Sequence, residues 1–240
     1  MDLGLAGRVA LVAGSSKGLG RGVARALANE RVSLVLCARG AEALEAAAAE
    51  LRARDVDVLA IAGDVTEPEM PAELVRAALE QFGRLDIVVS NSGGPPQARS
   101  LEIDDGQVHA AIEANLLTHV RFVQAALPAM REAGFGRLVA ISSFGVVQAI
   151  PTLALSNLAR SGLRAWAKTA AADLAGTGVT LNLLAPGLHR TDRIRALGET
   201  TGLLGDPDDF GKVAAFLCSS AAAFVNGATL VVDGGATLAL

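Results

Sequence analysis

A glycine-rich turn near the start of the chain has the residue types and spacing of a phosphate-binding loop. It follows an apolar run at residues 8–13 and leads into a stretch with helical periodicity at residues 18–29. Glycines let a backbone approach a pyrophosphate closely, and the N-terminus of the following helix supplies free N–H groups and a positive dipole end. This position in a strand–turn–helix unit favours a dinucleotide site over an ordinary tight turn. The residues predicted to hold the nucleotide here are Gly14, Ser16, Lys17, Gly18, Leu19 and Gly20.

Two basic residues predict which nucleotide is preferred. The second apolar run ends in Ala38 and Arg39, so Ala38 stands where an NAD site would place an acid for the ribose 2′-hydroxyl. A 2′-phosphate requires a nearby cation instead, and both Arg39 and Lys17 qualify. The other interpretation is that both are ordinary solvated charges. We expect NADP(H) to be preferred over NAD(H).

The spacing of the glycines is Gly-x-x-x-Gly-x-Gly, and further motifs follow in a fixed order along the chain. These are Asp64 with Val65, Asn91 with Gly93, Asn115, Ser142 with Ser143, Pro186 with Gly187 and Thr191, and Asp233 with Gly234 and Gly235. Over essentially its whole length the chain thereby resembles the short-chain dehydrogenase/reductase superfamily. The resemblance implies that Asp64 and Val65 contact the adenine. It also places Asn91, Gly93, Pro186, Gly187 and Thr191 beside the cofactor.

The same resemblance implies catalytic positions, and the chain departs from the family at two of them. The family uses a Ser at a strand end, a Tyr thirteen residues later and a Lys four residues after the Tyr. Counted from Ser143, these positions are occupied by Ser156 and Arg160, and the chain contains no Tyr. Arg stays protonated and cannot relay a proton, but it can hold ribose hydroxyls and stabilise an oxyanion. With Asn115, these residues resemble the site of a divergent 3-oxoacyl-acyl-carrier-protein reductase-like branch.

Another group must then supply the proton in a reduction. Water, Ser156 and His189 are the candidates, because an imidazole titrates near neutrality. The preferred interpretation of His189 is a solvent-facing loop residue beside Arg190. We expect His109 and His119 to lie at the surface or in subunit contacts.

No Cys, His and Asp residues have metal-ligand spacing, so no metal site is predicted.

The elements that must position these residues alternate between strand and helix. Apolar runs at 8–13, 32–38, 56–62, 85–90, 138–142, 179–184 and 229–232 predict strands. Helical patterns cover 18–29, 41–54, 67–82, 104–131, 153–175 and 208–219. This order predicts an α/β, Rossmann-type, doubly wound and mostly parallel seven-stranded sheet with helices on both faces, forming one domain over residues 1–240. Residues 188–205 form a substrate lid that is short for the family.

Composition excludes several other classes of protein. A net charge of −4 and a pI near 5.4 argue against nucleic-acid binding, and no apolar run is long enough to span a membrane. The only cysteines, Cys37 and Cys218, lie in apolar runs, which indicates buried thiols and a cytoplasmic location. Only 3% of the residues are aromatic.

Two functions remain open. The first is an NADP(H)-dependent oxidoreductase acting on a small carbonyl or alcohol substrate through a non-standard site. The second is a weakly active or inactive NADP(H)-binding sensor or subunit. The family resemblance implies that the helices predicted at 104–131 and 153–175 pack against their two-fold mates, and their small residues permit close approach. We therefore expect a dimer or, in preference, a homotetramer. These small residues are Ala110, Ala111, Ala114, Ala165 and Ala172.

Overall fold

Seven parallel strands form a single sheet in the computed structural model, which describes residues 2–196, 198 and 203–239. The strand order is β3-β2-β1-β4-β5-β6-β7, and every pairing is parallel. The strands are β1 (Val9–Ala13), β2 (Ser33–Ala38), β3 (Val58–Ala62), β4 (Ile87–Ser90), β5 (Gly136–Ile141), β6 (Val179–Pro186) and β7 (Thr229–Val232). The predicted doubly wound sheet is therefore confirmed, and it is parallel throughout.

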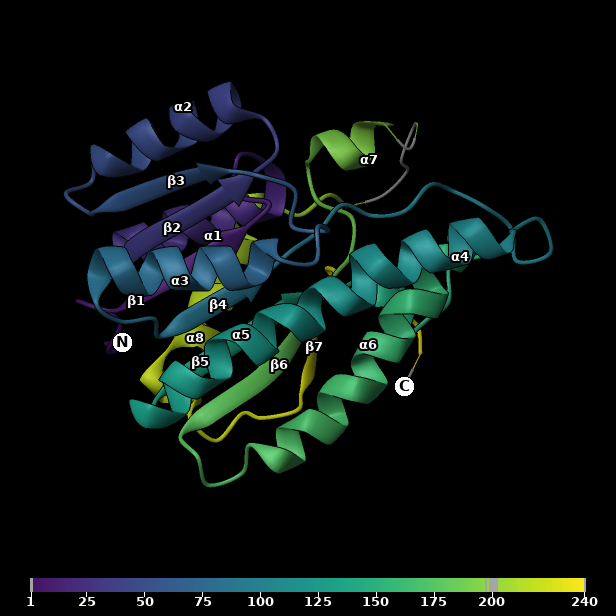
Figure 1. Cartoon of the computed structure of the whole chain (residues 1–240). Helices are drawn as coiled ribbons and strands as arrows, with labels where there is room; N and C mark the ends of the chain where they lie inside the picture. The colour runs from purple at the N-terminus through teal and green to yellow at the C-terminus, as the bar shows by residue number, and fades with distance from the viewer. Residues whose placement is uncertain (1, 197, 199–202, 240) are drawn as a thin grey trace.

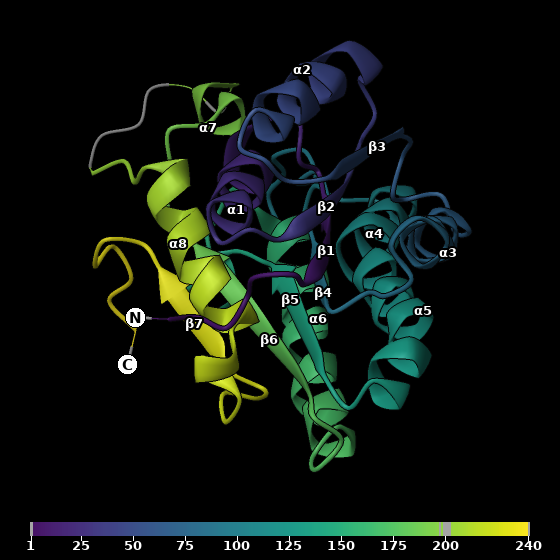
Figure 2. The same ribbon diagram turned by 90° about the vertical axis from the view of Figure 1, so that its left-hand side faces the viewer.

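Helices cover both faces of this sheet, as Figure 2 shows. One face carries α1 (Gly18–Asn29), α2 (Ala41–Arg52) and α8 (Pro207–Cys218). The other carries α3 (Met70–Phe82), α5 (Thr118–Glu132) and α6 (Ala154–Asp173). The central strands are fully buried because both faces are covered, which explains why their sequences are apolar throughout rather than alternating. Cys37 and Cys218 are both buried free thiols, as predicted.

The long helix predicted over residues 104–131 is interrupted. The structure has α4 (Asp105–Ile112), a π-helical turn (Glu113–Leu117) and then α5. A π turn contains an extra residue, so side chains beyond it are rotated by about 100° relative to one continuous α-helix. Gly162 of α6 lies against this turn, where an added Cβ would be 2.8 Å from Leu116 Cδ1.

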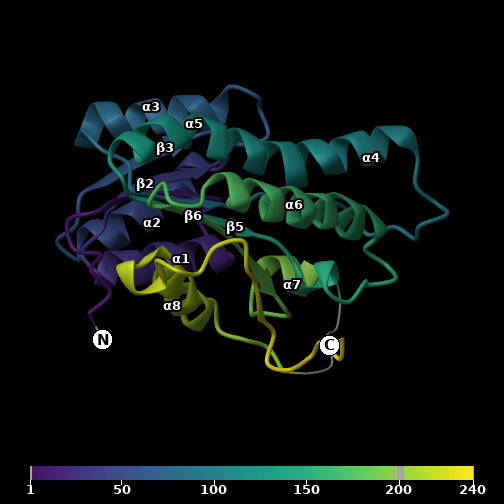
Figure 3. The same cartoon turned by 90° about the horizontal axis from the view of Figure 1, so that it is seen from below.

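The chain reverses its winding direction between β1 and β4, and this switch point opens a crevice at the carboxyl ends of the strands. The helix α4 and the start of α6 extend beyond those ends (Figure 1), and a view from below shows α7 (Asp192–Ala196) on the same side (Figure 3). Within its described residues, the segment predicted as a short lid contains this short helix, and residues 197 and 199–202 lie outside the described part.

Candidate functional site

The glycine turn after β1 is packed too tightly for larger residues. An added Cβ at Gly20 would lie 2.3 Å from the Gly14 carbonyl oxygen. Gly14 and Gly18 both have positive φ, at 61° and 58°, a region that favours glycine. The turn therefore requires glycine at these three positions.

The N-terminus of α1 meets the requirements of an anion-binding site. Lys17 is the N-cap residue, and it adopts an extended backbone that forms no side-chain cap. The first turn of α1 contains no acidic residue. Its N–H groups and the positive end of its dipole therefore face the crevice without a carboxylate competing for them. Ser16 and Leu19 are half-buried beside this turn.

Loops from three strands meet at the glycine turn. Asn91, after β4, donates from Nδ2 to the Gly14 carbonyl oxygen at 3.4 Å. Thr191, after β6, lies 3.4 Å from the position of a Cβ on Gly18. The predicted nucleotide contacts from β1, β4 and β6 thus lie at one edge of the sheet. Gly93 is exposed there, Pro186 is buried, and Gly187 packs closely against Asp233.

The two cations predicted to contact a 2′-phosphate lie at this edge, and each approaches an acid. Arg39 is 79% exposed, with Nη1 3.8 Å from an Asp64 carboxylate oxygen. Asp64 also accepts hydrogen bonds from the backbone N–H and hydroxyl of Thr66, while Val65 is buried. Lys17 Nζ lies 3.2 Å from a carboxylate oxygen of Asp192 on α7. Both pairs are largely exposed and therefore weak.

Ser143 follows the carboxyl end of β5, and Asn115 lies in the π turn between α4 and α5. Ser143 Oγ accepts a hydrogen bond from the Gly145 backbone N–H at 3.1 Å, so its hydroxyl proton remains available to donate. Asn115 is buried in the π turn, and its Nδ2 donates to the Ala111 carbonyl at 3.3 Å. Its Oδ1 is buried and has no partner among the described residues.

Ser156 and Arg160 are one turn apart on α6 and both are buried, with 7% and 5% exposed. Arg160 donates from Nη1 to the Ile141 carbonyl at the end of β5, at 2.8 Å. Burial, together with the charge of Arg193, lowers the pKa of Arg160 to about 10. The guanidinium is therefore still charged at neutral pH. In the described part of the chain no carboxylate lies within ion-pair distance of it.

Two further side chains of α6 hold the segment that carries Ser143, and the sequence analysis missed both. Asn157 donates from Nδ2 to the Ile150 carbonyl at 2.8 Å, and Arg164 donates to the Val146 carbonyl at 2.6 Å. With Arg160, they are spaced three and four residues apart along one face of the helix. That helical spacing could have indicated from the sequence that the three side chains share one face of α6.

His119 is buried, so the prediction that it lies at the surface or in a subunit contact was wrong. It is 1% exposed, and its Nδ1 is 2.7 Å from the hydroxyl oxygen of Ser90 at the end of β4. Burial and the nearby charge of Arg160 lower the pKa of His119 to about 3, so the ring is neutral at physiological pH. Its spacing of four residues from the buried Asn115 and three from the buried Phe122 places it on the inward face of the helix.

The other two histidines have different surroundings. His109 is exposed, and its Nδ1 lies 2.7 Å from the Asp105 carbonyl oxygen. His189 is 4% exposed rather than solvent-facing, and its ring meets Phe210 of α8 edge-on at 5.2 Å. Its Nδ1 is 3.1 Å from the Gly187 carbonyl oxygen. The ring therefore packs toward the face of the sheet covered by α8, whereas Arg160 lies on the face covered by α6.

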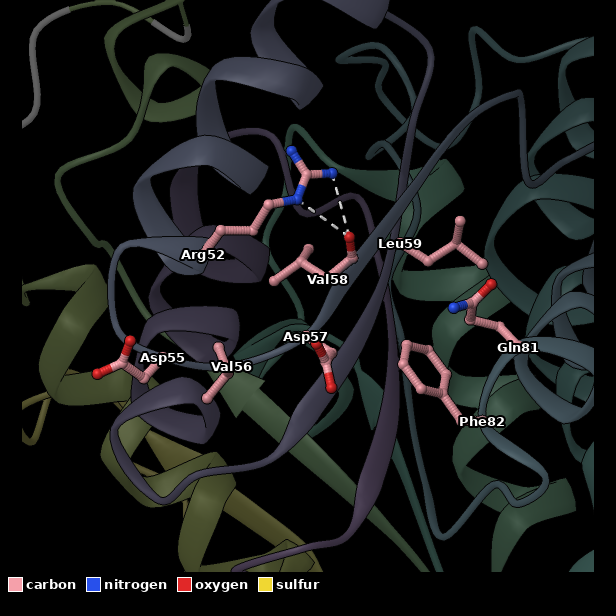
Figure 4. Close-up of a pocket in the computed structure, with 8 residues that line it drawn as sticks. All are labelled: Arg52, Asp55, Val56, Asp57, Val58, Leu59, Gln81 and Phe82. Carbon is pink, nitrogen blue, oxygen red and sulfur yellow. Dashed lines mark hydrogen bonds between the residues drawn. The ribbon is translucent and has the colours of Figure 1, made fainter.

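A separate depression of about 440 Å³ lies at the opposite ends of the strands, beside the start of β3 (Figure 4). Arg52 donates there from Nε and Nη2 to the Val58 carbonyl, at 3.2 and 3.1 Å. This guanidinium covers an otherwise open edge of the sheet. Asp55 and Asp57 give the depression an acidic lining that is unsuited to a phosphate.

The described residues contain no group of three potential ligands that could hold a metal ion. Among the helices of the described ranges, none has the length and apolar character needed to cross a bilayer.

An all-parallel sheet of this order, with a glycine turn at its switch point, defines a dinucleotide-binding domain of the Rossmann type. A family model described as enoyl-(acyl carrier protein) reductase matches residues 13–237. The chain belongs to the short-chain dehydrogenase/reductase family.

Individual relatives match the chain over nearly its whole length. Dehydrogenase/reductase SDR family member 4 of Rattus norvegicus is 32% identical over 96% of this chain and 88% of its own. The 3-oxoacyl-(acyl-carrier-protein) reductase FabG of Escherichia coli is 32% identical over 95% of this chain and 97% of its own. The crystal structure of L-sorbose reductase from Gluconobacter frateurii, complexed with NADPH and L-sorbose, is 29% identical with a TM-score of 0.94, covering 100% of both chains.

Proposed function

We propose that the protein is an NADP(H)-dependent oxidoreductase that interconverts a carbonyl compound and an alcohol, with a site that lacks the family's Tyr and Lys. The observation that carries the proposal is the geometry around the end of β5. There the hydroxyl of Ser143 is free to donate, and the buried charge of Arg160 has no carboxylate partner in the described chain. Both are suited to a carbonyl oxygen that becomes negative during reduction.

The nicotinamide cofactor, when bound, supplies or accepts a hydride at the substrate carbon. The glycine turn and the N-terminus of α1 fit its pyrophosphate, because they offer backbone N–H groups without a competing acid. Ser143 would orient the substrate oxygen by donating its hydroxyl proton. Arg160 would hold the nicotinamide ribose and stabilise the developing negative charge. Asn115 Oδ1 is buried without a hydrogen-bond partner among the described residues, and it would help to order the polar side chains of this site.

We assign proton delivery to water or to Ser156. An aliphatic hydroxyl is a weak acid, so Ser156 would pass on a proton from solvent rather than store one. His189 is the less suitable donor, because its ring is enclosed by Phe210 and directed toward the other face of the sheet.

The preference for NADP(H) over NAD(H) rests on charge. Ala38 leaves the end of β2 without an acid, and Arg39 and Lys17 bring two cations to the crevice. Their exposed ion pairs with Asp64 and Asp192 are weak enough for a phosphate dianion to displace them. The NADPH complex of the related L-sorbose reductase is in keeping with this choice.

Steady-state turnover tests the activity. With NADPH, a panel of ketones, quinones and 3-oxoacyl thioesters should include at least one substrate whose reduction is lost in Ser143→Ala and in Arg160→Met. Tight NADPH binding without turnover of any member would instead support the second function, an NADP(H)-binding sensor or subunit. The absence of a tyrosine from the chain favours that second function.

We also propose self-association as a dimer or tetramer. Ala110, Ala165 and Ala172 are exposed on α4 and α6, as an interface of closely packed helices requires. Ala111 does not contribute, because it is buried within the chain against Leu155 and Ala159. A sedimentation mass near that of the 24.4 kDa monomer at micromolar concentration would contradict this proposal.

A further inference from the structure

His119 is a polar side chain on a largely apolar face of the sheet. It is 1% exposed on α5, and the apolar cluster on this face includes Val88, Leu138 and Phe122. Burying an imidazole in such a place is costly unless both ring nitrogens have hydrogen-bond partners. Nδ1 lies 2.7 Å from Ser90 Oγ, whereas Nε2 is buried with no partner among the described residues. Nε2 is therefore the atom whose partner has to be found.

The contacts of Ser90 indicate which ring nitrogen carries the proton. Ser90 Oγ lies 2.7 Å from His119 Nδ1 and, at a longer distance of 3.5 Å, from the Val139 carbonyl oxygen. A hydroxyl has one proton to donate, and a carbonyl oxygen can only accept. Both contacts are hydrogen bonds at once only if Ser90 donates to Val139 and accepts from the Nδ1–H group of His119. In that tautomer Nε2 carries a lone pair, which makes it a buried acceptor.

The guanidinium of Arg160 is held over the neighbouring strand, next to this ring. Ser90, the last residue of β4, pairs with Ala140 of β5, and Ile141 is the next residue along β5. Arg160 Nη1 donates to the Ile141 carbonyl at 2.8 Å. Adjacent strands are about 4.8 Å apart, and successive residues advance by about 3.3 Å. The imidazole and the guanidinium are thus each bonded to adjoining positions at the carboxyl ends of β4 and β5.

Donors and acceptors on this face are complementary. A guanidinium has five N–H groups, and within the described residues Arg160 gives one of its nitrogens to a carbonyl. His119 Nε2 and Asn115 Oδ1, one helical turn apart, are buried acceptors without a partner in the same part of the chain. A buried charge needs such acceptors to offset its lost hydration. The charge of Arg160 also helps to lower the pKa of His119 to about 3, which keeps the ring neutral.

We propose that His119 is a positioning residue for Arg160: the lone pair on its Nε2 accepts a hydrogen bond that one buried water relays from the guanidinium. A water suits the site because Nε2 makes no direct hydrogen bond, and Asn115 Oδ1 offers the same water a second acceptor. The ring, fixed at Nδ1 by Ser90, then holds the guanidinium toward the nicotinamide ribose. This inference rests on the proposed function of Arg160 and deepens it.

Nitrogen NMR of the histidine rings tests the inference on the wild-type protein, without cofactor or turnover. The chain contains three histidines, and the signals lost in His119→Gln assign its ring. At neutral pH the ring should be uncharged and protonated at Nδ1, and Arg160→Met should change the Nε2 resonance because the relayed hydrogen bond is lost. A proton on Nε2 would overturn the inference. So would an Nε2 resonance that is the same in Arg160→Met and the wild type.

Substitutions of His119 separate the roles of its two ring nitrogens. Gln places an amide near the position of Nε2, Asn places one near Nδ1, and Phe keeps a ring without either nitrogen. In fluorescence titrations, His119→Phe and His119→Asn should weaken NADPH binding by roughly tenfold, and His119→Gln should stay within about threefold of wild type. Intact affinity in His119→Asn with a loss in His119→Gln would assign the role to the Ser90 contact and overturn the inference.

A double variant tests whether His119 acts through Arg160. Once Arg160→Met has removed the guanidinium, adding His119→Phe should lower NADPH affinity by no more than about twofold, because the two side chains act as one unit. Losses that add in full would mean that His119 acts elsewhere, which would contradict the inference.

Phe122→Leu is the matched control, because Phe122 is also buried on α5, about one turn further along the helix. This variant should lower the free energy of unfolding but leave NADPH affinity within about twofold of wild type. If Phe122→Leu weakens NADPH binding as much as His119→Phe does, the effect belongs to general packing and the inference is wrong.

The two kinds of measurement separate this inference from the proposed function. If NADPH binds and no carbonyl compound is reduced, the proposed reaction fails, but the affinities and the ring-nitrogen signals still test the positioning of Arg160. If the wild type does not bind NADPH, the proposed function fails, and the ring-nitrogen signals alone decide the inference.

Discussion

The glycine turn after β1 and a polar group of side chains after β5 lie at the same edge of the sheet but are built in different ways. We call this second group the polar floor; it consists of Ser143 together with Ser156, Asn157, Arg160 and Arg164 of α6. The turn is defined by backbone: an added Cβ at Gly20 would collide with the Gly14 carbonyl, and the expected ligands are N–H groups of α1. The floor is defined by side chains of α6 that reach back to the end of β5 and the segment after it.

This difference is consistent with the proposal that the glycine turn keeps the family pattern while the catalytic positions depart from it. Backbone N–H groups are independent of residue type, but the close approach that exposes them requires glycine. In the floor, Asn157, Arg160 and Arg164 anchor the chain through carbonyl oxygens, and Arg satisfies such an acceptor as well as Lys. A binding site built from backbone thus resists substitution, whereas anchored side-chain chemistry can change within an intact fold.

The largest expected effect comes from returning the floor to the family pattern. Ser156→Tyr with Arg160→Lys places a phenol and an ammonium one helical turn apart, which restores a general acid. Ketone reduction should rise by about 10²–10⁴. Each single change should help less, because the two groups act together. Steady-state rates with NADPH give the measurement.

NADPH affinity of this double variant must be measured in parallel, because Ser156 is only 7% exposed and a larger ring requires space. Intact nucleotide binding without a faster reaction would mean that the missing acid does not limit the rate.

A single added methyl group should disrupt the glycine turn after β1. Gly20→Ala should weaken NADPH binding by roughly 100-fold and lower the free energy of unfolding by about 1–3 kcal/mol, because the Cβ overlaps the Gly14 carbonyl. Fluorescence titration and urea unfolding measure the two effects. Gly106→Ala on α4 is the control, since its Cβ would meet only Asp104 Oδ1, at 3.2 Å. Unchanged NADPH affinity in Gly20→Ala would contradict the tight packing described for the turn.

The buried ring of His119 on α5 makes the free energy of unfolding depend on pH. The pKa of His119 is about 3 in the folded protein against an ordinary value of 6.5, so the unfolded chain binds a proton that the folded chain excludes. The free energy of unfolding should therefore fall as pH drops from about 6.5, by up to about 1.4 kcal/mol per pH unit. Hydrogen bonds from Arg25 and Arg21 lower the pKa of Glu50 to about 2 from an ordinary value of 4.5, so Glu50 adds to the loss only below about pH 4.5.

His119→Gln should flatten this dependence between pH 6.5 and 4.5, as measured by urea unfolding at several pH values. His109→Gln, at an exposed position, should retain the wild-type slope. The same slope in His119→Gln and wild type would mean that His119 does not carry the effect.

The smallest effect concerns the expected adenosine end of the nucleotide site, at the end of β2, where the predicted contact is the exposed side chain of Arg39. Ala38→Asp with Arg39→Ala should reverse the nucleotide preference from NADPH to NADH, by about tenfold or more, because an acid replaces a cation beside the 2′ position. Dissociation constants for both nucleotides give the answer. Arg76→Ala is the control, since Arg76 is an exposed residue of α3 paired with Glu80. Equal affinity of the wild type for the two nucleotides would contradict the assignment.

The sequence alone determined the order of the elements and the edge at which the predicted nucleotide contacts meet. Apolar runs without alternation predict strands covered on both faces, and parallel strands bring their carboxyl ends together whatever the details of packing. The structure has each predicted strand, with its ends shifted by two residues at most. Glycine positions were equally readable, because the backbone conformation they permit is a local property.

Only the tertiary structure decided which side chains meet. His119 Nδ1 lies 2.7 Å from the hydroxyl oxygen of Ser90 at the end of β4, 29 positions earlier in the sequence. Likewise, Arg193 reaches Pro95 across 98 positions of sequence, and Lys17 meets Asp192 on α7. Such partners are selected by the packing of distant segments, where a rotation or shift of one element exchanges one neighbour for another. Residue type and spacing therefore predict the chemistry that a segment offers, while the fold decides which partner it meets.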